Sequence, residues 1–191
     1  MTPDCRQHKP IETKAPDALS LTLRALEFAA WKHRDQRRKD TNASPYINHP
    51  IALATVLRIE GNVHDPTVIA AALLHDTIED TETTWQELRG AFGEEIAEVV
   101  LEVTDTKWLD SATRKRLQVQ KALASSKRAK LVKLADKICN LRDILASPPA
   151  KWSLERRQKY FDWAKEVVDR IRGVHPELER RFDEVFAQRP G

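Results

Sequence analysis

Residues 68–81 read Val-Ile-Ala-Ala-Ala-Leu-Leu-His-Asp-Thr-Ile-Glu-Asp-Thr, an apolar run that ends in a cluster of polar groups. The run predicts a helix that is buried on most sides. His75, Asp76, Glu79 and Asp80 then place one imidazole and three carboxylates within a short span. If the helix continues through them, His75 and Glu79 lie one turn apart, as do Asp76 and Asp80. We therefore expect the four side chains to share one broad face and to form a functional site.

The composition predicts an all-α fold made of a single bundle of about nine or ten helices. The chain has 191 residues, of which 41% are hydrophobic and 32% charged, with only five glycines, and alternating β-branched runs are scarce. Residues 1–16 hold three prolines and little apolar content, so we expect a mobile tail there and one domain over residues 17–191.

Several protein classes are excluded by simple counts. No stretch approaches 18 apolar residues, so we expect no membrane span, and the N-terminus lacks an apolar signal region, which favours the cytoplasm. Cys5 and Cys139 do not have a metal-binding spacing. The net charge of +3 neither requires nor excludes a nucleic-acid partner.

Two further segments have clear helical periodicity. Residues 19–32 carry the stripe Leu19, Leu23, Leu26 and Ala30, which predicts an amphipathic helix. Residues 129–145 carry a longer apolar stripe, made of Leu131, Leu134, Ile138, Leu141 and Leu145. On this second helix Lys133, Asp136 and Asn140 lie off the stripe and share a face of their own.

A metal site around His75 and Asp76 needs ligands from elsewhere, because two adjacent residues cannot close it. His49 stands where Pro50 favours the start of a helix, and Asp136 is a carboxylate in an otherwise apolar helix, where a free charge is costly. These four residues would suit a borderline divalent ion such as Mn²⁺, Fe²⁺ or Zn²⁺. Taken singly, His49 could instead cap a helix.

The alternative for Asp136 is an ion pair with Lys133 or Lys137. What favours the metal interpretation is the combination of all four residues in one order, with each predicted to lie in a helix.

This order resembles the HD superfamily of metal-dependent phosphohydrolases. Residues 37–39, 45–50, 71–81 and 130–142 together resemble the hydrolase domain of the RelA/SpoT family, above all its stand-alone small alarmone hydrolases, which include the metazoan SpoT homologue. The resemblance covers about residues 19–188. It implies a single HD domain and a chain that is a hydrolase only, without the synthetase and regulatory domains of the long family members.

The resemblance also implies a reaction and a set of site residues. The family removes pyrophosphate from the 3′ position of guanosine tetra- and pentaphosphate, written (p)ppGpp, with one Mn²⁺ ion, so Zn²⁺ and Fe²⁺ rank behind manganese. His49, His75, Asp76 and Asp136 match its metal ligands. Glu79 and Asp80 match the pair that orients and activates the attacking water, for which the alternative is a solvated helix end.

Six residues match the family's contacts with the nucleotide: Arg38, Lys39, Asn140, Trp152, Arg156 and Tyr160. Arginine supplies charge for phosphates and the aromatic rings supply flat surfaces for a base. For Trp152 and Tyr160 the alternative is ordinary core packing. One departure is Asp35, where long bacterial members have glycine; the metazoan-like enzymes also lack that glycine.

Other functions stay open at this stage. The nearest is removal of the 2′-phosphate of NADPH at the same site, and a second is a non-catalytic alarmone-binding protein, which the presence of both Glu79 and Asp80 disfavours. We expect a small-molecule nucleotide as partner, with no nucleic acid and no membrane, and the oligomeric state is left open.

Overall fold

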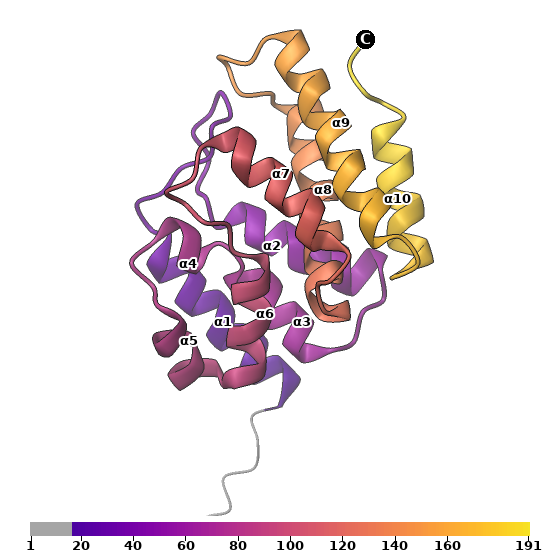
Figure 1. The fold of residues 1–191 in the computed structure, drawn as a ribbon. Coiled ribbons are helices and arrows are strands. Elements are labelled where there is room, and N and C mark those ends of the chain that lie inside the picture. The colour runs from indigo at the N-terminus through magenta and orange to yellow at the C-terminus, as the bar shows by residue number, and fades with distance from the viewer. Residues whose placement is uncertain (1–16) are drawn as a thin grey trace, which may run out of the picture.

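The computed structural model describes residues 17–191, in which ten α-helices and one π-helical segment form the fold (Figure 1). The predicted tail at residues 1–16 lies outside this part of the chain. Within the described residues the β-structure is a single isolated bridge between Arg37 and Pro45, so the all-α prediction is confirmed. None of the described helices is long and apolar enough to cross a membrane.

Most of the helices follow one another with short connections, and the longest connection, residues 33–47, joins α1 to α2. Their bounds are α1 Ala18–Lys32, α2 Asn48–Thr55, η1 Val56–Glu60 (the π-helical segment), α3 Pro66–Leu74, α4 Thr77–Asp80, α5 Trp85–Phe92, α6 Glu94–Val103, α7 Ser111–Ala122, α8 Lys127–Ala146, α9 Leu154–Ile171 and α10 Pro176–Phe186.

The centre of the fold is α3, in which every residue from Thr67 to Leu74 is buried. Asp65 caps its first turn by accepting a hydrogen bond from the Thr67 amide, and Pro66 occupies the first helical position. Helices α1, α2, α6 and α8 pack around it. Because neighbours cover it on all sides, α3 holds the residues that follow it inside the molecule.

The second organising element is α8, which lies beside α9 and α10 in the C-terminal half of the fold (Figure 1). Its predicted stripe is confirmed: Leu131, Leu134, Ile138 and Leu141 are buried, and Leu145 packs against the core. The helix also contacts α2, α3 and α6. It therefore connects the two halves of the chain.

The predicted helix over residues 19–32 is confirmed as α1, and Leu26 of its predicted stripe packs against the core, but the first half of that stripe was wrong. Leu19 and Leu23 are 67% and 56% exposed, whereas Ala25 and Ala29 are fully buried. The helix packs against α3, whose central residues are alanines. Small side chains let two helices approach closely, so alanines occupy the fully buried positions of α1, and Leu21 and Leu26 pack beside them.

The prediction of one continuous helix through residues 75–80 was also wrong. Helix α3 ends at Leu74 and the short α4 begins at Thr77, with Asp76 between them at φ −100° and ψ 0°. The Thr77 hydroxyl donates to the Leu74 carbonyl and satisfies the broken helix end. The break sends His75 and Asp76 in a direction that differs from that of Glu79.

Replacing Leu134 by alanine should lower the free energy of unfolding by about 2–5 kcal/mol, because Leu134 is fully buried in the stripe of α8. Urea unfolding followed by circular dichroism measures this change. Leu123→Ala is the matched control, since Leu123 is 66% exposed, and it should stay within about 0.5 kcal/mol of the parent protein. Equal effects of the two substitutions would contradict the assigned core.

Candidate metal centre and active site

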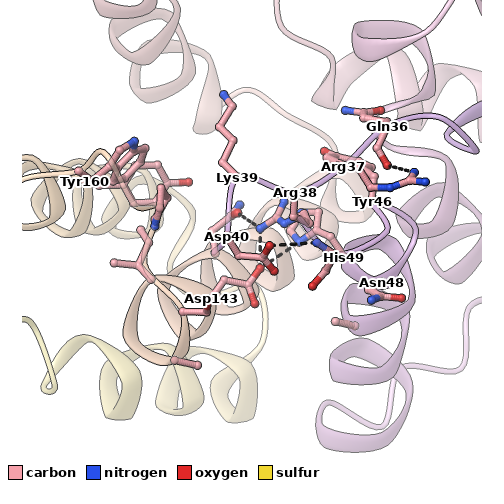
Figure 2. A pocket seen from close by; sticks show the side chains of 18 of the residues that line it. Gln36, Arg37, Arg38, Lys39, Asp40, Tyr46, Asn48, His49, Asp143 and Tyr160 are labelled. Carbon is pink, nitrogen blue, oxygen red and sulfur yellow. Dashed lines mark hydrogen bonds and ion pairs between the residues drawn. The ribbon is translucent and has the colours of Figure 1, made fainter. Parts of the chain in front are cut away.

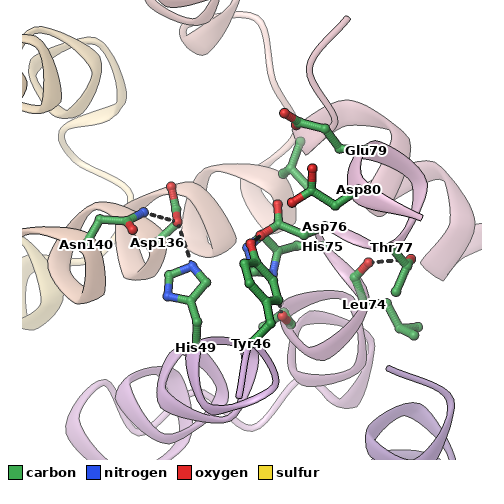
Figure 3. A network of polar contacts seen from close by, with 12 residues as sticks. Tyr46, His49, Leu74, His75, Asp76, Thr77, Glu79, Asp80, Asp136 and Asn140 are labelled. Carbon is green, nitrogen blue, oxygen red and sulfur yellow. Dashed lines mark hydrogen bonds and ion pairs between the residues drawn. The ribbon is translucent and has the colours of Figure 1, made fainter. Parts of the chain in front are cut away.

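Three of the four predicted metal ligands converge in the structure. His49 lies in α2, His75 directly follows α3 and Asp136 lies in α8 (Figure 3). One ligand atom from each lies within 4.8 Å of the other two, and both histidines are buried. Residues far apart in sequence thus form one compact donor set.

Hydrogen bonds fix the orientation of these side chains. His75 Nδ1 donates to the Ala72 carbonyl at 2.9 Å, which leaves Nε2 as the atom that faces the cluster. His49 Nε2 lies 3.3 Å from Asp136 Oδ1. Asp136 is held in turn by Lys137 Nζ at 2.9 Å and by the Asn140 amide. The donor set is therefore held in place by neighbouring side chains and backbone.

The fourth predicted ligand, Asp76, lies at the edge of the three-residue cluster. Its Oδ2 is 2.9 Å from His75 Nε2 and accepts a hydrogen bond from the Tyr46 hydroxyl. Tyr46 belongs to the turn that precedes α2 and stacks beside His33, with ring centroids 4.8 Å apart. Tyr46 thus sets the position of the Asp76 carboxylate.

The electrostatics of the cluster suit a cation. Burial lowers the pKa of His75, but the Asp76 and Asp136 carboxylates outweigh it and raise that pKa to about 9. Burial would raise the pKa of Asp136, but Lys137 and His49 hold it well below its usual range. Burial lowers the pKa of His49. The carboxylates thus make this buried site favourable for positive charge. The two imidazoles and the carboxylate of the cluster are ligands of the kind that bind a divalent metal ion.

Glu79 and Asp80 point to different partners beside this cluster. Glu79 accepts from Arg114 at 3.0 Å and from the Asp105 amide at 3.0 Å. Asp80 accepts from the Gln36 side chain at 2.9 Å and lies 3.6 Å from Lys107 Nζ. Burial raises the pKa of Glu79 to about 7, and nearby carboxylates add to that rise.

A large cavity opens beside the metal cluster and contains most of the predicted nucleotide contacts (Figure 2). Its volume is about 560 Å³, within the usual range for pockets that hold small molecules. Five of the six predicted contacts line it: Arg38, Lys39, Asn140, Trp152 and Tyr160.

Arg38 is anchored at the floor of this cavity, close to the metal cluster. Its guanidinium lies 2.5 Å from the Asp143 carboxylate and 3.3 Å from the Asn140 side-chain oxygen. Lys39 extends on the other side and is exposed (Figure 2). The cavity therefore has one cation that is held by side-chain partners, Arg38, and one that is exposed, Lys39.

The aromatic part of the predicted surface is formed, with one difference from expectation. The Trp152 and Tyr160 rings lie 5.5 Å apart, and Arg156 stacks on Trp152 at 4.6 Å. The difference is that Arg156, in the first turn of α9, does not line the cavity. Trp152 and Tyr160 are partly buried against the core, so both predicted roles, packing and lining, apply to them.

Sequence reasoning did not assign roles to several residues that complete the site. Arg114 and Gln36 hold Glu79 and Asp80, Tyr46 holds Asp76, and Asp143 holds Arg38. Asp143 lies two turns after Asp136 on α8, a spacing that could have identified it. The others come from segments distant from their partners, and the sequence contained no comparable signal for these pairs.

The helical bundle and its His/Asp cluster define an HD-domain protein. The sequence profile described as "HD domain" matches residues 25–161 of the chain.

Curated proteins of similar sequence place the chain within a smaller group of HD-domain proteins. The chain is 49% identical over 167 residues to the guanosine-3′,5′-bis(diphosphate) 3′-pyrophosphohydrolase MESH1 of Drosophila melanogaster, and 52% identical over 167 residues to the human protein of that name. Each match covers 87% of this chain and 93% of the relative.

A solved structure is similar throughout the fold. It is described as "A metazoan ortholog of SpoT hydrolyzes ppGpp and plays a role in starvation responses", and it aligns with a TM-score of 0.87 at 47% identity, covering 93% of this chain and 98% of the other. The chain therefore belongs to the MESH1 group of the HD-domain family.

A divalent metal ion, for which Mn²⁺ serves as the probe, should raise the thermal stability of the protein, because an ion that binds only the folded state stabilises it by mass action, by about 2.7 kcal/mol at one hundred times Kd. His75→Ala should abolish this rise and lower the Tm without metal, since it leaves buried carboxylates without their partner. Melting curves with Mn²⁺ and with chelator measure both effects.

The matched control for this substitution is His64→Ala, since His64 is exposed and lies outside the cluster. It should keep the full Mn²⁺ response. A normal Mn²⁺ response in His75→Ala would contradict the assigned ligand.

Proposed function

We propose that this protein is a Mn²⁺-dependent (p)ppGpp hydrolase that releases pyrophosphate from the 3′ position and leaves GDP or GTP, as part of a starvation response. The observation that carries the proposal is the position of the His49, His75 and Asp136 cluster at the edge of a nucleotide-sized cavity. The relatives named above, which the chain matches over most of its length, are 3′-pyrophosphohydrolases by name.

His49, His75, Asp76 and Asp136 would hold the metal ion in this proposal. Mn²⁺ prefers imidazole and carboxylate ligands to the softer thiolates, so this set of two histidines and two aspartates suits it. Four protein ligands would also leave room for oxygen ligands from water or substrate. When bound, the ion would supply Lewis-acid stabilisation and make a water molecule more acidic.

Glu79 and Asp80 would handle the attacking water. The raised pKa of Glu79, about 7, places its carboxylate close to the pH at which a general base works best. Arg114 and the Asp105 amide hold that carboxylate in one orientation, and each of its oxygens keeps a lone pair for a water proton. Asp80, held by Gln36, would orient the water by accepting a second hydrogen bond.

The large cavity would hold the nucleoside and its 5′-phosphates. Trp152 and Tyr160 offer ring faces for a purine base, and Arg156 stiffens this surface by stacking on Trp152. Arg38 and Lys39 would meet phosphate oxygens, and Asn140 links Arg38 to the ligand Asp136. Substrate binding and metal binding therefore share a hydrogen-bonded network.

The direct test compares kcat/KM for ppGpp and for NADPH with the purified protein at a fixed Mn²⁺ concentration. Release of pyrophosphate from ppGpp, with the larger kcat/KM, is the expected result. A larger value for NADPH would replace the proposal by a 2′-phosphatase. Binding of ppGpp without turnover of any nucleotide would replace it by a sensor.

Asp80→Asn should keep the Mn²⁺-induced rise in Tm and lower kcat by about 10²–10⁴-fold, because the neutral amide cannot orient the water in the same way. Steady-state hydrolysis of ppGpp measures the loss. Asp35→Asn is the control, since the Asp35 side chain is 89% exposed, and it should retain full activity. Activity of Asp80→Asn within a few-fold of the parent protein would refute the role of Asp80.

The value of kcat/KM should increase with pH through about 7, because Glu79 accepts a proton only when it is ionised and its pKa is raised to about 7. Well below that pH the rate should fall about tenfold per pH unit. A pH profile from 5.5 to 9 with Mn²⁺ held saturating measures this limb. Glu79→Gln should lose the limb together with most activity, whereas the exposed control Glu98→Gln should keep both.

A further inference from the structure

A second, smaller cavity of about 160 Å³ is lined by the metal cluster itself, by Glu79 and by Lys133. It shares Arg38, Tyr46, His49, Asn140 and Tyr160 with the large cavity, so the two chambers meet at the cluster. Its volume equals the share of about five water molecules in the liquid, which gives room for a diphosphate group. The cluster and Glu79 already have roles in this chamber, whereas Lys133, which also lines it, has none so far.

Three cationic side chains line the smaller chamber, and two of them already have carboxylate partners. Arg38 lies 2.5 Å from Asp143, and Lys137 lies 2.9 Å from Asp136. The third, Lys133, is buried and donates to the Val103 carbonyl at 3.3 Å. Within residues 17–191 no carboxylate lies within 4.0 Å of its ammonium group.

The carboxylates that line the chamber are engaged elsewhere. Asp76 and Asp136 belong to the metal cluster, Glu79 accepts from Arg114, and Asp105 accepts from Gln118 at 2.6 Å. Lys133 therefore carries a buried charge that these groups do not neutralise by direct contact.

A buried ammonium with a single carbonyl partner is unfavourable in a folded protein. An ammonium has three donors, and here only one is used. Burial, together with the nearby Lys137 ammonium, lowers the pKa of Lys133. A polyanion bound in the chamber would remove this penalty by accepting the remaining hydrogen bonds, so the position of Lys133 is explained by a ligand.

We propose that Lys133 and the smaller chamber form a subsite for the terminal phosphoryl group of a 3′-diphosphate, and for the pyrophosphate released from it. This inference rests on the proposed function, because it assigns the part of the substrate that lies beyond the reacting phosphorus. The nucleoside occupies the large chamber, the reacting phosphorus lies at the metal cluster, and the terminal phosphate lies against Lys133.

The reaction balances with this arrangement. The water oxygen bonds to the phosphorus attached to O3′, its proton passes to Glu79, and the bond between that phosphorus and O3′ breaks. O3′ takes up a proton from solvent and remains on the nucleoside, pyrophosphate leaves with the new oxygen, and Glu79 returns its proton to solvent, so that one water molecule is consumed. Lys133 touches only the terminal phosphate, so it contributes to diphosphate substrates and not to monophosphates.

The test uses two substrates that differ only in the terminal phosphate: ppGpp and guanosine 5′-diphosphate 3′-monophosphate. Lys133→Met should lower kcat/KM for ppGpp by about tenfold or more, the usual value of a hydrogen bond to a charged group. It should change kcat/KM for the monophosphate by less than twofold. Equal losses on both substrates, or no loss on either, would overturn the proposal.

The variant should fold, because methionine fits the same length of side chain and removes a buried charge, and its Tm should equal or exceed that of the parent. Lys127→Met is the matched control, since Lys127 is exposed at the start of the same helix, and both substrates should keep their parent values.

A direct binding measurement tests the subsite independently of the proposed catalytic function. Calorimetry with Mn²⁺ present should show that inorganic pyrophosphate binds the parent protein more tightly than inorganic phosphate, and that Lys133→Met loses this preference. If the parent protein hydrolyses neither guanosine substrate, the proposed function fails, and the pyrophosphate titration still decides the subsite. If the parent turns over ppGpp but pyrophosphate binds both proteins equally, the subsite fails alone.

Discussion

The contact between Asp136 of α8 and His49 of α2 is the interaction on which the rest of the site depends. It places a carboxylate from the C-terminal half of the chain against an imidazole from the N-terminal half, next to His75. Each of these groups would be costly to bury alone. Together, the carboxylate and the imidazoles reduce the cost of burying one another, and a bound divalent cation would neutralise the remaining negative charge. The fold therefore brings three distant segments to one point.

The apolar helix α3 supports this buried polar cluster. Its complete burial fixes the position at which the chain emerges, and the break after Leu74 aims His75 and Asp76 into the space between α2 and α8. Asn140 and Lys137 then hold Asp136, while Tyr46 holds Asp76. A rigid core thus supports a polar cluster whose members are held by hydrogen bonds before any ligand arrives, which is what a preorganised site requires.

The two chambers that meet at this cluster differ in the side chains that line them. The larger one has aromatic faces and cations suited to a nucleoside with phosphates, and the smaller one has a buried ammonium with little compensation. A substrate that spans both must carry its scissile group in the middle. This geometry links the choice of substrate to the position of the bond that breaks, since both follow from where the chambers meet.

Much of the fold and of the site could be predicted from local patterns. The burial of α3, the apolar stripe of α8 and the helix starts at Asp65-Pro66 and Ser153 follow from periodicity and capping, which act over a few residues. The identities of His49, His75 and Asp136 as partners came from their order and residue types. The helix features depend on neighbouring residues, so the sequence determined them, whereas the three distant site residues were identified by the resemblance of their order to a known family.

The tertiary structure alone decided which surfaces and side chains meet. The most deeply buried positions of α1 are alanines, where it packs against the alanine-rich α3, and α3 ends at Leu74 next to an Asp76 that is held by Tyr46 of a distant segment. The pairing of Glu79 with Arg114 and the burial of Lys133 in the smaller chamber likewise depend on distant segments. Contacts of this kind depend on packing distances between helices, which no local pattern in the chain encodes.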